Sequence, residues 1–318
     1  FWLKFFSMGK AKQASPKRPE GRVATAKKQF AKPSKDLGRD KEKTKLSAQG
    51  SDPQSAAEDS ALQQVEFAGS VEDVQQGTVA ADPVHALSVP RHAEERKTGD
   101  RVIVILEKAA LELVFVKGVY QLLNVDDHKT ILSKNQREMT NIRPDITHQC
   151  LLTLLDSPLN KAGRLIVYIH TAGNVLIEVN PQLRVPRTFR RFCGLMVELL
   201  QRHKIRAAGT SDILLKVISN PVTKYLPDGG RKIGLSVAGR LVNVRDYASK
   251  ILLDSKTQSV HVPPTFVIGA VAHGDPVQDA GFGGDYVDEK ISVSNWGLSA
   301  ACCCGKVCNE FEQLWGVL

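Results

Sequence analysis

The pattern of apolar and polar positions changes near residue 100 of this chain of 318 residues. Before that point Lys, Ala, Ser, Gln and Pro dominate, and apolar residues do not recur at helical or strand spacing. Such a segment buries too little apolar surface to offset the entropy that it would lose on ordering. Beyond it, apolar runs recur as far as the C-terminus, over a length that suits one globular domain. We therefore expect a disordered tail over residues 1–100 and a folded domain over residues 101–318.

Runs of helical and of strand type alternate along the expected domain. Apolar positions three and four residues apart indicate helices, whereas short apolar or alternating runs indicate strands. Two of the strand-like runs are separated by Ala172-Gly173-Asn174, which is typical of a hairpin turn. The alternation predicts an α/β fold with a largely parallel sheet. The expected helices cover residues 145–156, 187–203 and 302–314, and the expected strands cover residues 101–106, 165–171, 175–179, 214–218 and 233–237.

Two segments near the C-terminus combine a strand-like run with small residues. Thr265–Gly274 and Ile291–Ala301 each start as an apolar or alternating run and then break into Gly, Ser and Ala. A strand that ends in such residues presents bare backbone N–H and C=O groups where the chain turns. Two such turns at the edge of an α/β sheet are expected to form a ligand cleft. The alternative is a pair of ordinary buried strands with tight turns.

The formal net charge of +9 is unevenly distributed. Residues 1–45 carry fourteen Lys or Arg against four acidic residues, and residues 46–100 carry three against ten. A basic arm followed by an acidic spacer indicates contact with an anionic polymer, most simply nucleic acid. Residues 10–45 also suit a nuclear or nucleolar import signal. The alternative is a tail that only keeps the protein soluble.

No apolar run in the sequence is long enough to span a bilayer, so we expect no membrane partner. The apolar stretch Phe1–Phe6 is too short for the core of a signal peptide. Met8 fits a translation start, which would leave residues 1–7 as upstream sequence.

Four of the six cysteines fall on the expected C-terminal helix, at positions 302, 303, 304 and 308. Neighbouring cysteines on one helix cannot pair readily, and their spacing does not match that of zinc ligands. We interpret them as small core residues in a reducing compartment, and we expect neither a disulfide nor a metal site.

Basic residues gather in the segment Asn180–Arg191. Arg184 and Arg187 lie where the expected helix begins, and Arg187, Arg190 and Arg191 would share one helical face. Cations at a helix N-terminus oppose its dipole, so the cluster is expected to have an anionic partner such as phosphate. The alternative is a solvated face with intramolecular salt bridges.

Arg143-Pro144-Asp145 forms a second basic site, in which Asp145 could also cap the following helix. His148, His170 and His273 each stand in apolar company, and we interpret them as structural. The sequence contains no Walker loop, no GxGxxG motif and no recognisable Ser-His-Asp arrangement.

A dense set of motifs extends from about residue 101 to the C-terminus. It includes RPDITHQ at 143–149, DSPLNKAG at 156–163, IEVNPQ at 177–182, RFCGLMV at 191–197, LKVISNPV at 215–222, and the segments 266–274 and 293–301. Together these motifs resemble the eukaryotic pseudouridine N1-methyltransferases of small-subunit ribosome biogenesis. The tail up to about residue 100 lies outside the resemblance.

The resemblance implies a SPOUT-class fold, with a largely parallel sheet, helices on both faces and a C-terminal chain threaded through a trefoil knot. It implies an S-adenosylmethionine-dependent enzyme that methylates N1 of a pseudouridine in small-subunit rRNA. It further implies a homodimer that works on the pre-ribosomal assembly particle in the nucleolus or nucleus. The competing hypothesis is a non-catalytic RNA-binding assembly factor, which would not need the Gly-rich cleft.

The resemblance also implies site residues. RNA contacts fall on Arg143, Arg184, Arg187 and Arg191. The cofactor pocket falls on Leu235, Gly269, Gly274, Val293, Ser294, Asn295, Trp296, Gly297 and Leu298. Two features depart from the family: Trp296-Gly297 stands where the family has Tyr-Pro, and residues 275–288 are longer and Gly-rich. Gly297 is expected to loosen a loop that Pro would hold.

The implied reaction places few demands on side chains. N1 of pseudouridine becomes nucleophilic once it loses its proton, so the enzyme needs to orient an extruded base and to favour its deprotonated form. Asp145 is the one carboxylate that we nominate, either to accept this proton or to orient Arg143.

The expected C-terminal helix also carries a candidate dimer contact. Val307, Phe311, Leu314 and Trp315 would present more apolar surface than the end of a chain needs. An exposed apolar patch of this kind usually marks an interface.

Overall fold

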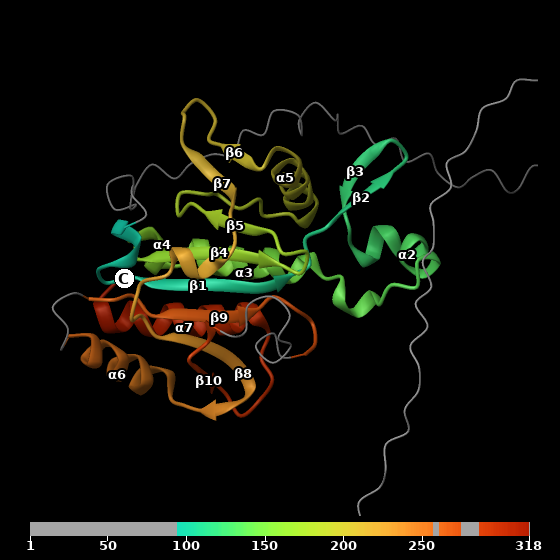
Figure 1. Cartoon of the computed structure of the whole chain (residues 1–318). Helices are drawn as coiled ribbons and strands as arrows, with labels where there is room; N and C mark the ends of the chain where they lie inside the picture. Colours follow the sequence, from blue (N-terminus) through green and yellow to red (C-terminus); the bar gives the residue numbers. More distant parts are fainter. Residues whose placement is uncertain (1–93, 257–260, 275–285, 318) are drawn as a thin grey trace, which may run out of the picture. The chain divides into compact units, whose positions relative to one another are not determined.

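The computed structural model describes residues 94–256, 261–274 and 286–317 (Figure 1). Most of the expected tail therefore lies outside the described residues. Its last seven residues, however, are ordered: Glu94–Lys97 form the 3-10 helix η2, and Arg96 forms an ion pair with Glu178. The backbone N–H of Gly99 also donates to the carbonyl of His261 at 2.9 Å. The expected boundary at residue 100 thus falls within ordered chain.

An eight-stranded sheet forms the centre of the described chain, in the order β10-β8-β9-β1-β4-β5-β7-β6. The first five strands of this order run parallel to their neighbours, and the last three pair antiparallel. The parallel strands are β1 Val102–Ala109, β4 Leu165–Thr171, β8 Lys232–Leu241, β9 Thr265–Gly269 and β10 Glu289–Ser292, and the others are β5 Leu176–Val179, β6 Lys204–Arg206 and β7 Ile213–Ile218. The expected hairpin of β4 and β5 is confirmed, but one edge of the sheet is antiparallel.

Strand β1 lies at the centre of the sheet because it is apolar on both faces. Val102, Val104 and Leu106 point to one core cluster, whereas Ile103 and Ile105 point to another, and all five are fully buried. A strand buried on both faces appears in the sequence as a continuous apolar run, and the run at 101–106 is one of the expected strands.

The α-helices that contact the core cover one face of the sheet. These helices are α3 Pro144–Asp156, α4 Pro158–Lys161, α5 Phe189–Arg202, α6 Val244–Lys256 and α7 Ala300–Trp315. On the second face, the described residues that pack on the strands include the 3-10 helix η4, Val222–Tyr225, and the segments around Leu226 and Val287. Arg96 of η2 also lies on this face, where it contacts Glu178 and Tyr168. Among the described residues, the expectation of helices on both faces is therefore met on the second face by 3-10 helices and not by α-helices.

A hairpin and a helix absent from the sequence prediction follow β1. Strands β2 Leu113–Val116 and β3 Val119–Leu122 form a separate two-stranded sheet that packs beside α5 (Figure 1). Its turn residues Lys117 and Gly118 both have positive φ, at 49° and 85°. Asn-Gly is the usual signal for such a turn, so a Lys at its first position hid the hairpin. Helix α2, Val125–Lys134, follows with Asn124 as its N-cap, and η3, Met139–Asn141, leads into α3.

Candidate functional site

A cavity of about 430 Å³ opens where the strands β8, β9 and β10 separate. Strand β8 pairs with β9 only as far as Gly234, and its pairing with β10 breaks between Gly234 and Arg240. The residues between these points, 235–239, leave the ladder, and their departure exposes the carboxyl end of β9 at Ile268 and Gly269. A break of this kind at the carboxyl edge of a parallel sheet is a usual place for a ligand.

The predicted cofactor residues come together at this cavity, although Leu235 and Val293 are more than fifty residues apart in sequence. Asn295 is the one member of the predicted set that does not line it. The residues that do are Leu235, Gly269, Gly274, Val293, Ser294, Trp296, Gly297 and Leu298. Sequence reasoning missed further lining residues, among them Ser236–Ala238 and Cys303. The bulge that presents residues 236–238 depends on pairing with β10, and no local pattern signals it.

The loop after β10 is ordered by its own serines. Ser292 Oγ donates to the carbonyl of Ser294 at 2.7 Å, and the backbone N–H of Trp296 donates to Ser294 Oγ at 3.0 Å. The Trp296 side chain is 78% exposed. A Cβ on Gly297 would meet no atom within 4 Å, so nothing in the surroundings of this position requires glycine. Residue 297 can therefore differ from the family without a packing change.

Helices α3 and α7 run parallel, which places the start of α3 at the same end of the sheet as the cavity. Cys150 contacts Cys304, a Cβ on Gly305 would lie 3.5 Å from Thr153, and the backbone N–H of Leu159 donates to Glu312 at 3.0 Å. Residue numbers rise in the same direction along α7 and along α3 with the α4 turn that follows it. The N-termini of α3 and α7 therefore lie at the same end. The N-terminus of α7 borders the cavity through Ala300 and Cys303.

Asp145 holds Arg143 at the start of α3. The guanidinium donates from Nε to Oδ1 at 2.8 Å and from Nη2 to Oδ2 at 2.7 Å. This bidentate hydrogen bond is the largest cause of a lowered pKa at Asp145. A carboxylate whose two oxygens are engaged and whose pKa is lowered is a poor proton acceptor. Of the roles considered for Asp145, the geometry supports the orientation of Arg143.

The remaining predicted RNA-contacting arginines, Arg184, Arg187 and Arg191, are all exposed. The prediction that Arg187 shares a helical face with Arg191 is wrong, because α5 begins at Phe189 with Thr188 as its N-cap. The guanidinium of Arg187 instead forms a bidentate ion pair with Asp156, with Nη2 and Oδ1 3.1 Å apart. For this residue the structure shows the salt bridge that was the alternative interpretation.

The arginines do not gather at one point. Arg143 lies at the N-terminus of α3, whereas Arg187 reaches Asp156 at its C-terminus. A helix of 13 residues is about 20 Å long. Arg143 and Arg187 therefore lie at opposite ends of α3.

Two of the three histidines are structural, as expected. His148 is buried, with Nε2 2.7 Å from the carbonyl of Pro186 and its ring stacked on Phe192 at 4.6 Å. His170 is buried against Glu107. His273 differs, since it is exposed and lines the cavity.

The six cysteines are free, and Cys150, Cys304 and Cys308 are buried. Burial raises the pKa of Cys308 to about 12, so its thiol stays protonated and inert. Of the four cysteines on the C-terminal helix, the interpretation as core residues holds for Cys304 and Cys308, whereas Cys303 is partly buried and Cys302 is exposed. Among the described residues, no three His, Cys, Asp or Glu side chains come together where they could hold a metal ion.

The apolar patch expected on the C-terminal helix is not exposed. Val307 and Phe311 are fully buried, because α3 and α6 pack against α7, and Leu314 and Trp315 are partly buried. Arg164 also covers the Trp315 ring, with its guanidinium carbon 5.5 Å from the ring centroid. The argument for a dimer contact through these four side chains is therefore wrong.

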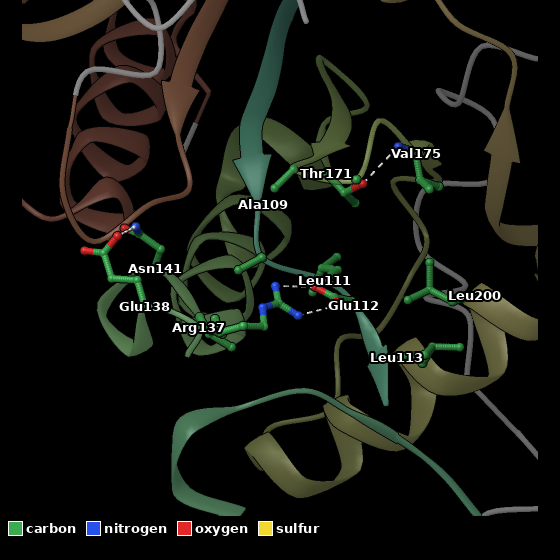
Figure 2. A pocket seen from close by; sticks show the side chains of 14 residues that line it. Ala109, Leu111, Glu112, Leu113, Arg137, Glu138, Asn141, Thr171, Val175 and Leu200 are labelled. Carbon is green, nitrogen blue, oxygen red and sulfur yellow. Dashed lines mark hydrogen bonds and ion pairs between the residues drawn. The ribbon is translucent and has the colours of Figure 1, made fainter. Parts of the chain in front are cut away.

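A second cavity, of about 520 Å³, lies past the carboxyl ends of β1 and β4 (Figure 2). Leu111 and Leu113 line it near β2, and Leu200 of α5 borders it. Arg137 and Glu112 form a bidentate ion pair at its rim, at 2.6 and 2.7 Å. The sequence analysis missed this cavity because the hairpin that helps to form it went unpredicted.

An α/β sheet with a cavity at its carboxyl edge defines a class of proteins that bind a small ligand or cofactor at the strand ends. Comparison with known proteins makes this specific. A family model described as EMG1/NEP1 methyltransferase matches residues 104–312. The chain therefore belongs to the EMG1/NEP1 methyltransferase family.

Individual relatives agree with this assignment. A Drosophila melanogaster protein named ribosomal RNA small subunit methyltransferase NEP1 is 50% identical over 222 residues, which cover 70% of this chain and 85% of the relative. A Homo sapiens protein of the same name is 51% identical over 221 residues, or 69% and 84% of the two chains. Among solved structures, Archaeoglobus fulgidus Nep1 bound to S-adenosylhomocysteine is similar, with a TM-score of 0.53 and 26% identity. That match covers 69% of this chain and all of the other.

Proposed function

We propose that this protein transfers a methyl group from S-adenosylmethionine to N1 of a pseudouridine in small-subunit rRNA, during assembly of the small ribosomal subunit. The observation that carries the proposal is the cavity between β8, β9 and β10, which eight of the nine predicted cofactor residues line. Relatives about 50% identical are named small-subunit rRNA methyltransferases, and a similar solved structure is bound to S-adenosylhomocysteine.

The residues at the cavity fit this cofactor. A volume of about 430 Å³ lies within the range of roughly 300–1,000 Å³ that small-molecule sites occupy. Leu235, Ile268 and Leu298 supply apolar walls that suit an adenine ring. The turns at Gly269–Gly274 and Val293–Leu298 supply backbone N–H and C=O groups, which suit ribose hydroxyls and an amino-acid group. When bound, the cofactor would supply an electrophilic methyl group.

The chain's own part in the reaction is to bind and orient the RNA. Arg143, fixed by Asp145, presents a guanidinium at the same end of the sheet as the cavity, where it would hold a phosphate of the target strand. A cation near the target also favours the deprotonated form of the pseudouridine imide. Because Asp145 is engaged with Arg143, we assign it a positioning role and leave the proton of N1 to solvent.

Several further properties stay predictions. We propose a homodimer, a trefoil knot in the C-terminal chain, action on the pre-ribosomal particle and a nucleolar or nuclear location. These rest on the resemblance and on the basic segment at residues 10–45.

The experiment that tests the function is mass spectrometry of small-subunit rRNA nucleosides from cells with and without the protein. Loss of the N1-methylated pseudouridine, restored by the parent chain, is the expected result. If the nucleoside persists without the protein while small-subunit assembly fails, the non-catalytic assembly factor is the correct function.

A further inference from the structure

Glu107 and His170 form a buried ion pair that has no part in the proposed reaction. Both residues are only 3% exposed, and Nδ1 of His170 lies 2.5 Å from Oε1 of Glu107. The pair lies at the carboxyl ends of β1 and β4, on neighbouring strands of the sheet. It borders the Ile103–Ile105 face of the sheet, which faces away from α3 and α7.

Hydrogen bonds around the pair identify its charge state. The side-chain nitrogen of Asn220 donates to Oδ1 of Asn174 at 2.9 Å, so this oxygen is an acceptor. Nε2 of His170 lies 2.9 Å from the same oxygen and must therefore donate a hydrogen. The hydrogen bond to Glu107 raises the pKa of His170, which favours a second hydrogen on Nδ1. With a hydrogen on both ring nitrogens, His170 is an imidazolium and Glu107 is its carboxylate partner.

Glu107 also bonds Ala270 and Tyr286, which both belong to the described residues. Its backbone carbonyl accepts from the N–H of Ala270 at 2.8 Å, where the chain leaves β9. Its second carboxylate oxygen accepts from the hydroxyl of Tyr286 at 3.2 Å, where the chain approaches β10. Burial and the charge of Glu107 raise the pKa of Tyr286, so the hydroxyl keeps the proton that it donates.

The residues that follow Ala270 form a wall of the cofactor cavity. Val271, Ala272, His273 and Gly274 line the cavity directly after Ala270. Glu107 pairs in register with Gly269, another lining residue. The main chain of Glu107 therefore contacts the start of this wall, while its side chain bonds His170 and Tyr286.

A buried ion pair seldom stabilises a fold more than a well-packed apolar pair of the same shape. Its value here lies in the fixed direction of its hydrogen bonds. We propose that Glu107, oriented by His170 and joined to Tyr286, is a positioning residue that fixes the backbone of residues 270–274 for S-adenosylmethionine. The inference rests on the proposed function, since it assigns the cofactor to this cavity.

Tyr286→Phe in the full chain is the direct test, because it removes one hydroxyl and keeps a ring packed on the Ile103–Ile105 face. The dissociation constant for S-adenosylmethionine, measured by calorimetry, is expected to rise about threefold to tenfold, as for a partly lost hydrogen bond to a charged group. The KM for the cofactor should rise in parallel, with kcat at saturating cofactor and RNA affinity close to the parent.

Tyr225→Phe is the matched control. Tyr225 packs against the same cluster, and its hydroxyl interacts with Ser219 at 3.0 Å, away from the cofactor segment. This variant is expected to bind S-adenosylmethionine as the parent does. Glu107→Gln provides a second measurement: the ring nitrogens of His170 should lose their imidazolium ¹⁵N shifts, and cofactor affinity should fall at least as far as in Tyr286→Phe.

The outcomes separate this inference from the proposed function. A parent chain that binds no S-adenosylmethionine overturns the cofactor site itself. If the parent binds the cofactor and Tyr286→Phe binds it with the same affinity, only the positioning role of Glu107 is overturned. The same conclusion follows if Tyr286→Phe and Tyr225→Phe weaken cofactor binding equally.

Discussion

Gly239 of β8 lies directly against the backbone of Ile291 in β10. A Cβ added to Gly239 would lie 2.6 Å from the carbonyl carbon of Ile291 and 2.8 Å from its Cα and N. These atoms are backbone and cannot rotate away. The close approach lies where the two strands resume pairing, at Arg240 and Ile291, after the bulge that forms the cofactor cavity.

Gly239→Ala is therefore expected to displace β10 and to lower the free energy of unfolding by about 1–3 kcal/mol, as overpacking does. It should also weaken cofactor binding, because β10 leads into the cavity loop. Gly297→Ala is the control, since a Cβ there would meet nothing within 4 Å, and its cost should stay within about 0.5 kcal/mol. Urea denaturation of both variants measures the difference. Equal stability of the two would contradict the close approach of Gly239 and Ile291.

The second prediction concerns the cofactor. The full chain is expected to bind S-adenosylmethionine in the presence of EDTA, because backbone groups and apolar walls form the cavity. Ala272→Trp should abolish this binding by filling the cavity, whereas Ala110→Trp, which fills the second cavity, should leave it unchanged. Calorimetry on the three proteins tests this. No heat from the parent at high micromolar ligand would refute the site.

The third prediction concerns Asp145 and acid. The hydrogen bond from Arg143 lowers the pKa of Asp145, so the unfolded chain takes up this proton more readily than the folded one. The stabilisation by the pair is present above the ordinary Asp pKa of about 4 and is lost as pH falls through the lowered folded value.

The melting temperature of Asp145→Asn should accordingly lie below that of the parent at neutral pH. This difference in melting temperature should disappear on acidification. RNA affinity should fall, because Arg143 loses its bidentate partner, while cofactor affinity is kept. Melting curves across the acid range and RNA titrations measure both effects. A difference in melting temperature that stays constant with pH would show that the pair does not titrate as described.

The fourth prediction separates RNA contact from folding. Arg187→Gln with Arg191→Gln should weaken RNA binding and reduce its salt dependence, by somewhat under one unit of slope for each lost phosphate contact. The melting temperature should change little, because the Arg187–Asp156 pair is exposed and such pairs contribute little.

The control for the fourth prediction is Arg202→Gln at the opposite end of α5. Arg202 is also exposed and also paired, with Glu198 at 3.0 Å. The Arg202→Gln variant should bind RNA as the parent does. The two arginines are not RNA contacts if the double variant matches Arg202→Gln in affinity and salt slope, or if it melts far earlier than the parent.

Local patterns in the sequence predicted much of the fold. Helix α3 was expected over 145–156 and spans Pro144–Asp156, and β4 has its expected bounds. Helix α6 was overlooked although Val244, Tyr247, Ala248 and Ile251 repeat at helical spacing and are buried. This helix was predictable, because the helical spacing of its apolar residues is present in the sequence. The β2–β3 hairpin is different, because the Lys117-Gly118 turn departs from the usual turn residues.

The sequence by itself determined which segments are buried and which residue types form the cofactor cavity, because apolar spacing and small residues are local properties. Only the tertiary structure decided what those residues contact. Phe311 was expected at an exposed patch and is buried, because α3 and α6 happen to pack on its helix. Arg187 was expected on a helix and instead reaches Asp156, 31 residues away in sequence. The break between β8 and β10 that opens the cavity depends on pairing between distant strands, and that pairing has no local signal.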